Sequence, residues 1–355
     1  MRKKVIRVLK AAGIVILCMI AIVIGFFAYV LITEFKPEDV EELGYTTSSL
    51  ELDKRDITLV TWNTGYAGLD ASTDFVLDGG KQVNPASRQL VAENMEAIDS
   101  VLEELRADFY LLQEVDYNSS RSFHLDAVDY YLPALATRIY ARNLVCRWIP
   151  YPIPMIGKVD SGVVLLSDYR VSDAIRRQLP IPFSWPVSVF NLKRCLEVSH
   201  VPISGCDEEL TIINLHLEAY DDGEGKAAQK AMLMKVMEEE YAKGNYVIVG
   251  GDFNHWFPGT SAIYGDNPEL WTPAYFEEND IPDGWRFAYD GSVPTCRSLD
   301  KPYTGSNDHQ FYVLDGFILS PNVELVSVET LDHDFANTDH NPVKLRVLLG
   351  TDSDD

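Results

Sequence analysis

The sequence predicts an α/β fold that follows a transmembrane helix. Along residues 57–349, apolar runs typical of strands alternate with patterns typical of helices, which is the order expected of an α/β domain. Residues 11–33 contain no charged side chain and, as a helix, are long enough to cross a hydrocarbon core of about 30 Å. The chain of 355 residues is therefore expected to contain one membrane span and one large domain.

The charges on either side of the apolar run predict its orientation. Five Lys and Arg residues precede it, whereas the residues that follow are mostly acidic. Because Lys and Arg favour the cytoplasmic side, residues 1–10 are expected to be a cytoplasmic tail and residues 11–33 a signal anchor. The alternative is a cleaved signal peptide, whose apolar region is usually about 7–15 residues and ends at a small-residue cleavage site. No such site is evident before Glu34.

The remaining segments are assigned by composition. Residues 34–56 are acidic and polar without periodicity, so they are expected to form a juxtamembrane linker, and residues 350–355 an acidic tail. Residues 57–349 contain no second linker and are expected to be one domain. Helices are predicted at residues 86–105 and 226–242. Strands are predicted at residues 57–62, 109–112, 161–166, 210–217, 246–249, 312–319 and 343–348.

The net charge limits the class of partner. It is −24 for the whole chain, and residues 1–33 carry five basic groups and no acidic ones, so the rest carries −24 − 5 = −29. An acidic surface repels nucleic acid at long range, which argues against a dedicated nucleic-acid binder. It does not exclude an enzyme that meets nucleic acid briefly in a cleft.

Cysteine use leaves one alternative open. Cys195 and Cys206 flank a probable hairpin, where either a disulfide or two free thiols would fit. No C-x-x-C motif is present, so structural zinc is not expected.

Polar side chains follow or interrupt several of the apolar runs. Taken singly, each has an ordinary interpretation as a turn residue. Asn214 and His216 are two apart in a predicted strand, so both side chains project from the same face. Asp252 and Asn254 repeat this spacing after two glycines. Asp315 lies among apolar residues and would need a donor such as a histidine ring. The recurrence predicts one polar site where these strands end.

In chain order these segments read WN, QE, a strand histidine, GDFN, a strand aspartate and DHNPV. They resemble the motifs of the endonuclease/exonuclease/phosphatase superfamily over about residues 57–348. That superfamily includes deoxyribonucleases, abasic-site endonucleases, sphingomyelinases and inositol-polyphosphate phosphatases. The resemblance implies a four-layer α/β/β/α sandwich with the site at one end of two sheets, and phosphoester hydrolysis with Mg²⁺, or alternatively Mn²⁺, as cofactor.

The resemblance also implies three metal-binding residues. Glu114 would be the main carboxylate ligand, and Asn63 would bind the metal directly or through water. Asp339 would complete the metal or histidine shell. Hard divalent cations prefer such oxygen donors and keep several waters.

Five further positions match catalytic residues of the superfamily. Asp252 would align or deprotonate the attacking water, and Asn254 would hold a phosphate oxygen. His340 would contact the scissile phosphate and be oriented by Asp315. His216 matches the second histidine of the deoxyribonuclease and sphingomyelinase branches, which assists the leaving group.

Two residues are candidates for binding substrate. Arg121 follows the QE motif and could hold a phosphate with two parallel hydrogen bonds, although an ordinary surface arginine is an equal alternative. Asn214 is the second candidate, because it shares a strand face with His216.

The leading functional interpretation is hydrolysis of a phosphodiester, in nucleic acid or a lipid head group, outside the membrane. A phosphomonoesterase of the same fold is the first alternative. A catalytically inactive binding domain is the second, and it predicts substitutions at motif positions that the sequence does not have. A free secreted nuclease would result if the span were cleaved. No obligate protein partner is evident, and no exposed apolar hairpin for entering a bilayer stands out, so the two diester classes stay unranked.

Overall fold

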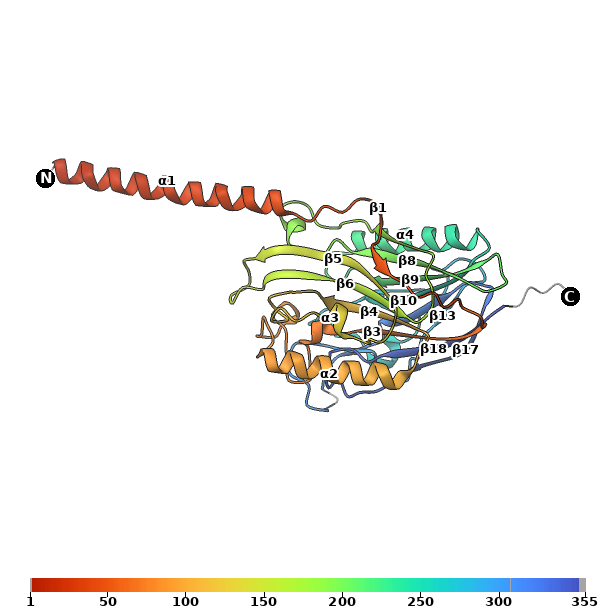
Figure 1. The fold of residues 1–355 in the computed structure, drawn as a ribbon. Helices are drawn as coiled ribbons and strands as arrows, with labels where there is room; N and C mark the ends of the chain where they lie inside the picture. Colours follow the sequence, from red (N-terminus) through yellow and green to blue (C-terminus); the bar gives the residue numbers. More distant parts are fainter. Residues whose placement is uncertain (1, 307, 351–355) are drawn as a thin grey trace.

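The computed structural model describes residues 2–306 and 308–350. Two seven-stranded mixed sheets pack face to face in this part of the chain. Helix α2 (Arg88–Leu105) covers the outer face of one sheet, and helix α4 (Glu224–Tyr241) covers the outer face of the other (Figure 1). The α/β/β/α sandwich implied by the sequence is confirmed.

The strands of each sheet are given in spatial order. The first sheet contains β1 (Val40–Glu42), β7 (Asp173–Gln178), β8 (Cys195–Pro202), β9 (Glu209–His216), β10 (Tyr246–Asp252), β16 (Asp315–Leu319) and β13 (Arg286–Ala288). The second sheet contains β17 (Val323–Thr330), β18 (Val343–Leu349), β3 (Asp56–Asn63), β4 (Phe109–Asp116), β6 (Gly157–Ser167), β5 (Thr137–Ile149) and β2 (Tyr45–Thr46). Strands β9 and β10 are parallel to each other, and so are β3 and β4. Two parallel strands that follow one another in the chain need a crossover connection, which α4 provides between β9 and β10 and α2 between β3 and β4.

The smaller elements lie in the connections. Two short ribbons pair β11 (His255–Trp256) with β12 (Ala274–Tyr275), and β14 (Cys296–Arg297) with β15 (Phe311–Tyr312). The short helices are α3 (Ala127–Tyr130), α5 (Ser261–Tyr264) and the 3₁₀ turns η1 (Gly65–Ala67), η2 (Val76–Asp78) and η3 (Val187–Val189).

Alternation along the strands separates the central core from the outer cores. Leu59 on β3 faces the first sheet and meets the cluster that contains Ile212 and Phe317, whereas its neighbour Val60 faces α2. On α2, the buried residues Val91, Met95, Ile98 and Leu102 recur at helical spacing. The two sheets are thus held together by one continuous apolar layer.

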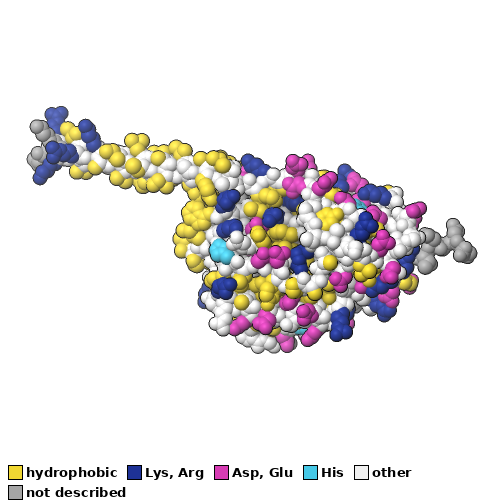
Figure 2. Space-filling view, viewed as in Figure 1, with side chains coloured by type: hydrophobic (Ala, Val, Ile, Leu, Met, Phe, Trp, Pro, Cys, Tyr) yellow, Lys and Arg dark blue, Asp and Glu magenta, His cyan; other side chains and the backbone are white. Residues whose placement is uncertain are grey.

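Helix α1 (Arg2–Thr33) projects away from the sandwich (Figure 1). Its segment Lys4–Thr33 is long and apolar enough to cross a membrane, by length and composition. Hydrophobic side chains cover its length and are largely exposed, unlike those of a core helix (Figure 2).

The predicted linker at residues 34–56 is partly wrong, because some of it belongs to the sheets. Strand β1 pairs with β7, and β2 pairs with β5. Leu52 is completely buried in the central core. Pairings of two or three residues are too short to show periodicity in the sequence. The predicted tail at 350–355 lies outside the described residues, apart from Gly350.

Two other expectations also change. The strand predicted at residues 312–319 is interrupted between β15 and β16, because Thr295 Oγ1 accepts the backbone N–H groups of Leu314 and Asp315 (2.9 and 3.1 Å). The interruption places Asp315 at the start of β16. The disulfide alternative is wrong: Cys195 and Cys206 are both free thiols in the structure.

Candidate active site

The strand register brings the predicted residues of the first sheet to one edge. Asp252 ends β10, where it is opposite His216 on the parallel strand β9 and opposite Asp315 on the antiparallel strand β16. In the second sheet, β3 ends at Asn63 beside the part of β4 that carries Glu114. The side chains converge because the strands that carry them stop at the same end of the sandwich.

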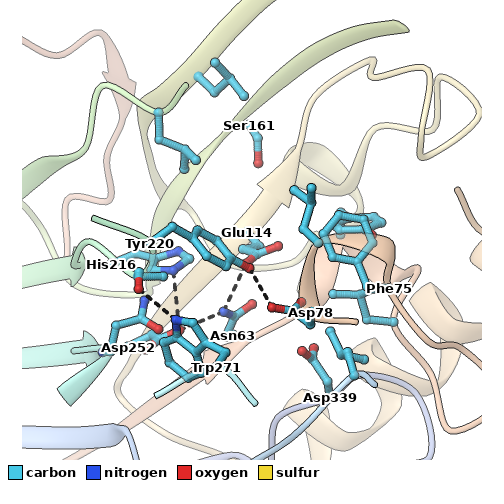
Figure 3. Close-up of a pocket in the computed structure, with 18 of the residues that line it drawn as sticks. Asn63, Phe75, Asp78, Glu114, Ser161, His216, Tyr220, Asp252, Trp271 and Asp339 are labelled. Carbon is cyan, nitrogen blue, oxygen red and sulfur yellow. Dashed lines mark hydrogen bonds and ion pairs between the residues drawn. The ribbon is translucent and has the colours of Figure 1, made fainter. Parts of the chain in front are cut away.

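A cavity of about 220 Å³ lies at this end. The predicted residues that line it are Asn63, Glu114, Arg121, His216, Asp252, Asn254, Asp339 and His340. Asp315 and Asn214 are not among its lining residues. Figure 3 shows Glu114 and Asn63 at the centre of the view, with Asp252 and His216 on one side and Asp339 on the other.

A β-bulge aims Glu114 into the cavity. The register of β4 against β6 shifts between Leu112 and Val115, and Glu114 has a φ of 51°. Such a backbone conformation is uncommon outside glycine, and bulges redirect a side chain at the cost of local strain. Burial raises the pKa of Glu114, and the nearby Asp339 carboxylate raises it further, against the opposing effect of Arg121.

The Glu114–Asp339 end of the cavity fits a hard divalent cation. The negative charge of Asp339 raises the pKa of Glu114, so a cation bound beside both carboxylates would relieve this repulsion, and Mg²⁺ prefers oxygen ligands. Two tighter groups have ligand atoms within 4.8 Å of one another, but they fit less well. One consists of Asp339, His340 and Cys296, and the Cys296 thiol is a soft ligand. The other is Asp252 with Asp315 and His340, which already share an internal hydrogen bond.

Asn63 contacts the acids through its amide nitrogen. Nδ2 donates to Asp252 Oδ2 (3.0 Å) and lies 3.4 Å from Glu114 Oε1, while Oδ1 accepts the Gly65 N–H (3.0 Å). In this geometry Asn63 holds two carboxylates in place, and its binding to a metal, directly or through water, stays a prediction. The assignment of the amide atoms follows from these partners.

His340 and Asp315 form the buried pair that the sequence suggested. His340 Nδ1 lies 2.8 Å from Asp315 Oδ2, and Trp62 Nε1 donates to the His340 carbonyl oxygen (2.9 Å). Burial alone would lower the pKa of His340, but the charge and hydrogen bond of Asp315 raise it well above its usual value. The pairing with Asp315 favours the protonated ring, whose Nε2 lies 3.8 Å from Asp252 Oδ2.

Asp252 is a carboxylate with a pKa near neutrality. The Asn254 N–H donates to its Oδ1 (2.9 Å), and His216 Nε2 lies 3.4 Å from its Oδ2. Burial and the neighbouring Asp315 raise the pKa of Asp252 to about 7. Burial, with the positive charges of Arg194 and His340, lowers the pKa of His216 well below its usual value, which favours the neutral ring. The same acid is thus flanked by two histidines whose pKa values are shifted in opposite directions.

The two predicted substrate-binding residues are placed differently from the prediction. Asn214 lies between the sheets, where Nδ2 donates to the Val164 carbonyl (3.0 Å) and Oδ1 accepts from Gln113 Nε2 (2.8 Å). Arg121 lines the cavity, but Nε and Nη2 are paired with Asp116 (3.1 and 2.9 Å). This edge of the guanidinium is thus used inside the protein, and binding of a phosphate by Arg121 stays a prediction.

Three residues in the cavity wall were not anticipated. The Tyr66 ring lies under the Arg121 guanidinium, 3.9 Å from its carbon to the ring centroid. Tyr220 donates from its hydroxyl to Asp78 Oδ1 (3.2 Å) across the cavity (Figure 3). Burial, and secondarily the charge of Asp339, raise the pKa of Asp78 to about 7. These residues lie in loops and 3₁₀ turns without a motif, so only their position identifies them.

Comparisons with known proteins agree with this architecture. The model of the endonuclease/exonuclease/phosphatase family matches residues 60–354. A protein of that description from Beutenbergia cavernae DSM 12333 is 17% identical with a TM-score of 0.58, over 84% of this chain and 72% of that one. TDP2 from Caenorhabditis elegans is 17% identical with a TM-score of 0.52, and the match covers 84% of this chain and 76% of that one. ANGEL2, described as a 2',3'-cyclic phosphatase, is 13% identical with a TM-score of 0.54, and the match covers 89% of this chain and 100% of that one. At these identities the structural matches show a common fold only. A comparison with curated proteins finds no match.

Proposed function

We propose that this chain, which belongs to the endonuclease/exonuclease/phosphatase family, hydrolyses a phosphodiester by direct attack of water. Members of the family are phosphoesterases that typically use divalent metals. The observation that carries the proposal is the arrangement around Asp252: its Oδ2 lies 3.4 Å from Nε2 of His216 and 3.8 Å from Nε2 of His340, whose Nδ1 is paired with Asp315.

Asp252 is proposed to be the general base. A base works best when its pKa lies near the working pH, because it is then ionised and still takes up a proton readily. The Asn254 N–H and Asn63 Nδ2 hold its two oxygens, so the carboxylate is oriented before a water binds. A water between Asp252 and the phosphorus atom would lose its proton to the carboxylate as it attacks.

The two histidines are proposed to meet the charge that develops on the phosphate. His340 is kept protonated by Asp315 and would donate from Nε2 to a non-bridging oxygen. His216 is neutral and would assist the leaving oxygen, in line with its position beside the same acid. Phosphoryl transfer depends mainly on such positioning and charge neutralisation.

Glu114 and Asp339 are proposed to hold one Mg²⁺, with Asn63 keeping Glu114 in place. When bound, such a cation supplies Lewis-acid neutralisation of the phosphate. The bulge and positive φ at Glu114 support this role, because backbone strain is retained where a side chain must point into a site.

The domain is proposed to lie outside the cytoplasm. The support is the excess of Lys and Arg in residues 1–10, before the uncharged part of a helix long enough to span a bilayer. Residues 11–33 would be the span itself, retained as an anchor.

A diester is preferred over a monoester because of charge. The cavity wall carries four acids, Asp78, Glu114, Asp252 and Asp339, and three arginines, two of which are paired with carboxylates outside this set. A monoester dianion would therefore meet more repulsion from these acids than a diester monoanion. The fold of ANGEL2, a 2',3'-cyclic phosphatase, is compatible with diester chemistry.

The test uses the full chain in detergent or vesicles with Mg²⁺ or with EDTA. It would be offered bis(p-nitrophenyl) phosphate, p-nitrophenyl phosphate, DNA, RNA and phospholipids. We expect EDTA-sensitive cleavage of the diesters and little cleavage of the monoester. Faster cleavage of the monoester would favour the phosphomonoesterase alternative. No cleavage by folded, Mg²⁺-binding protein would favour a binding domain.

A further inference from the structure

Two uncharged loops stand beside the carboxyl-terminal part of α1. The first, residues 148–156, joins β5 to β6, and the second, residues 183–190, precedes and includes η3. Neither loop contains a charged residue. The large apolar side chains that they expose are Trp148, Tyr151, Ile153, Met155, Trp185 and Val187. Ile153 is 89% exposed and Trp185 is 55% exposed, which is unusual for such side chains gathered on one surface.

Ring contacts fix these loops against α1. The Phe26 and Trp148 rings are 5.6 Å apart, and the Phe27 and Trp185 rings are 6.0 Å apart. Hydrophobic side chains cover α1 and continue onto the adjoining end of the domain (Figure 2). The exposed loops and the proposed membrane span therefore form one continuous apolar surface.

The position of the contacts along α1 sets the depth of the loops. Phe26 and Phe27 precede the end of the helix at Thr33 by six or seven residues, which is about 10 Å at 1.5 Å per residue. If α1 spans a bilayer to Thr33, the two tryptophans reach below the outer surface. A depth of about 5–10 Å is where interfacial apolar side chains insert, and tryptophan favours this zone.

The same loops also line the catalytic cavity. Its wall includes Ile149, Tyr151, Ile156 and Phe190 as well as Glu114. The Phe190 ring packs edge-on against Tyr151 (5.9 Å between centroids) and also lines a small groove against α1. One cavity thus connects a surface beside the anchor with the acids and histidines at the strand ends.

We propose that the loops 148–156 and 183–190 dock into the outer leaflet of the bilayer that holds α1, and that the cavity takes its phosphodiester from lipid in that leaflet. The substrate part rests on the proposed function; the docking part rests on the loops and α1 alone. The bilayer is favoured over a protein partner because α1 places it against these side chains in the same chain. The sequence did not single out this surface, since its proline-rich loops have no strand-like alternation.

The first test measures the depth of the tryptophans in the full chain. The chain has six tryptophans and α1 contains none; Trp62, Trp256 and Trp285 are buried, and Trp271 lines the cavity. Fluorescence is compared in phosphatidylcholine vesicles with ordinary and with brominated acyl chains. We expect quenching in the wild type and loss of most of it in the W148F/W185F variant. No quenching, or equal quenching in the variant, would overturn the docking.

The second test separates docking from chemistry. Ile153 and Met155 do not line the cavity, so I153S/M155S leaves the catalytic groups intact. In the full chain in vesicles of phosphatidylcholine, sphingomyelin and phosphatidylglycerol, we expect head-group release to fall by about tenfold or more, from the lost apolar burial, with bis(p-nitrophenyl) phosphate cleavage unchanged. An unchanged lipid rate, an equal loss on both substrates, or cleavage of DNA and RNA but no lipid would overturn the lipid substrate. A wild type inactive on every diester would instead refute the proposed function, with the quenching result unaffected.

Discussion

The two ends of the cavity differ in how the chain builds them. The polar end is made at the ends of paired strands, where Asn63, Asp252 and His216 are held by the ladders of two sheets. The apolar end is made by loops, where Tyr151 and Phe190 pack together beside α1. A rigid frame suits groups that must be placed to a fraction of an ångström, whereas an apolar surface needs area and little precision.

This contrast indicates how variants at each end should behave. Changes at the polar end should affect the chemical step on every substrate. Changes at the apolar end should affect only substrates that are presented by a membrane, as the I153S/M155S variant tests. The predictions below sharpen the first half of the contrast.

The largest effect is expected for His340→Ala. It removes the cation held by Asp315, so kcat should fall by roughly 10²–10⁴-fold with a smaller change in KM. Steady-state cleavage of bis(p-nitrophenyl) phosphate checks this. His124→Ala is the matched control, because His124 is exposed and its ring contacts only Asn118 among the described hydrogen bonds. Equal loss in both variants would contradict the role of His340.

Next in size is the effect of Glu114→Gln on metal use. Loss of the carboxylate should raise the Mg²⁺ concentration for half-maximal activity by at least about tenfold. The measurement is activity as a function of Mg²⁺, beside Glu103→Gln on the exposed face of α2. A Mg²⁺ dependence identical to that of the wild type would move the metal away from Glu114.

The pH dependence should follow Asp252. Its pKa is raised to about 7, so below that pH the group is protonated and cannot act as base. The rate should therefore rise with pH by up to about tenfold per unit below 7 and level off above it. Asp78 also has a pKa of about 7, so Asp78→Asn is the control and should keep the same profile. If the rate of Asp78→Asn no longer changed with pH around 7, the pH dependence would be assigned to Asp78 instead of Asp252.

The smallest effect on activity is expected for Asn214→Leu. Inside the core, the Asn214 amide accepts a hydrogen bond from Gln113 and donates one to the Val164 carbonyl. Loss of these two hydrogen bonds leaves buried polar groups unpaired, which should lower the free energy of unfolding by about 1–3 kcal/mol. Thermal unfolding measures the cost, and kcat/KM of the folded fraction should change little. A large rise in KM without loss of stability would restore Asn214 as a substrate-binding residue.

The sequence predicted the polar end well because strand register carries over to space. Asp252, His216 and Asp315 are adjacent since hydrogen-bonded ladders fix which residues face one another. The same logic misplaced Asn214. A spacing of two shows that Asn214 and His216 project from the same face of a strand, but it does not show how far each lies from the end of the strand where the cavity is. The sequence could not show that Arg121 is paired with Asp116, because the two residues carry no pattern that distinguishes an internal partner from a substrate phosphate.

The apolar end could not be predicted from periodicity. The segment 148–156 contains three prolines and reads as an irregular connection, and its exposure depends on where β5 and β6 stop. Residues 40–46 were taken for linker for a similar reason, since β1 and β2 are too short to alternate. Tertiary contacts, absent from any local pattern, determine both regions.

The most direct test of the central claim compares Asp252→Asn with the wild type on bis(p-nitrophenyl) phosphate in Mg²⁺. The variant keeps the size of the side chain and its contact with the Asn254 N–H, but it cannot take up the proton of the attacking water. We predict a fall in kcat of about 10²-fold or more, with the fold and Mg²⁺ binding retained. A variant with wild-type kcat would contradict water attack assisted by Asp252 and, with it, the proposed mechanism.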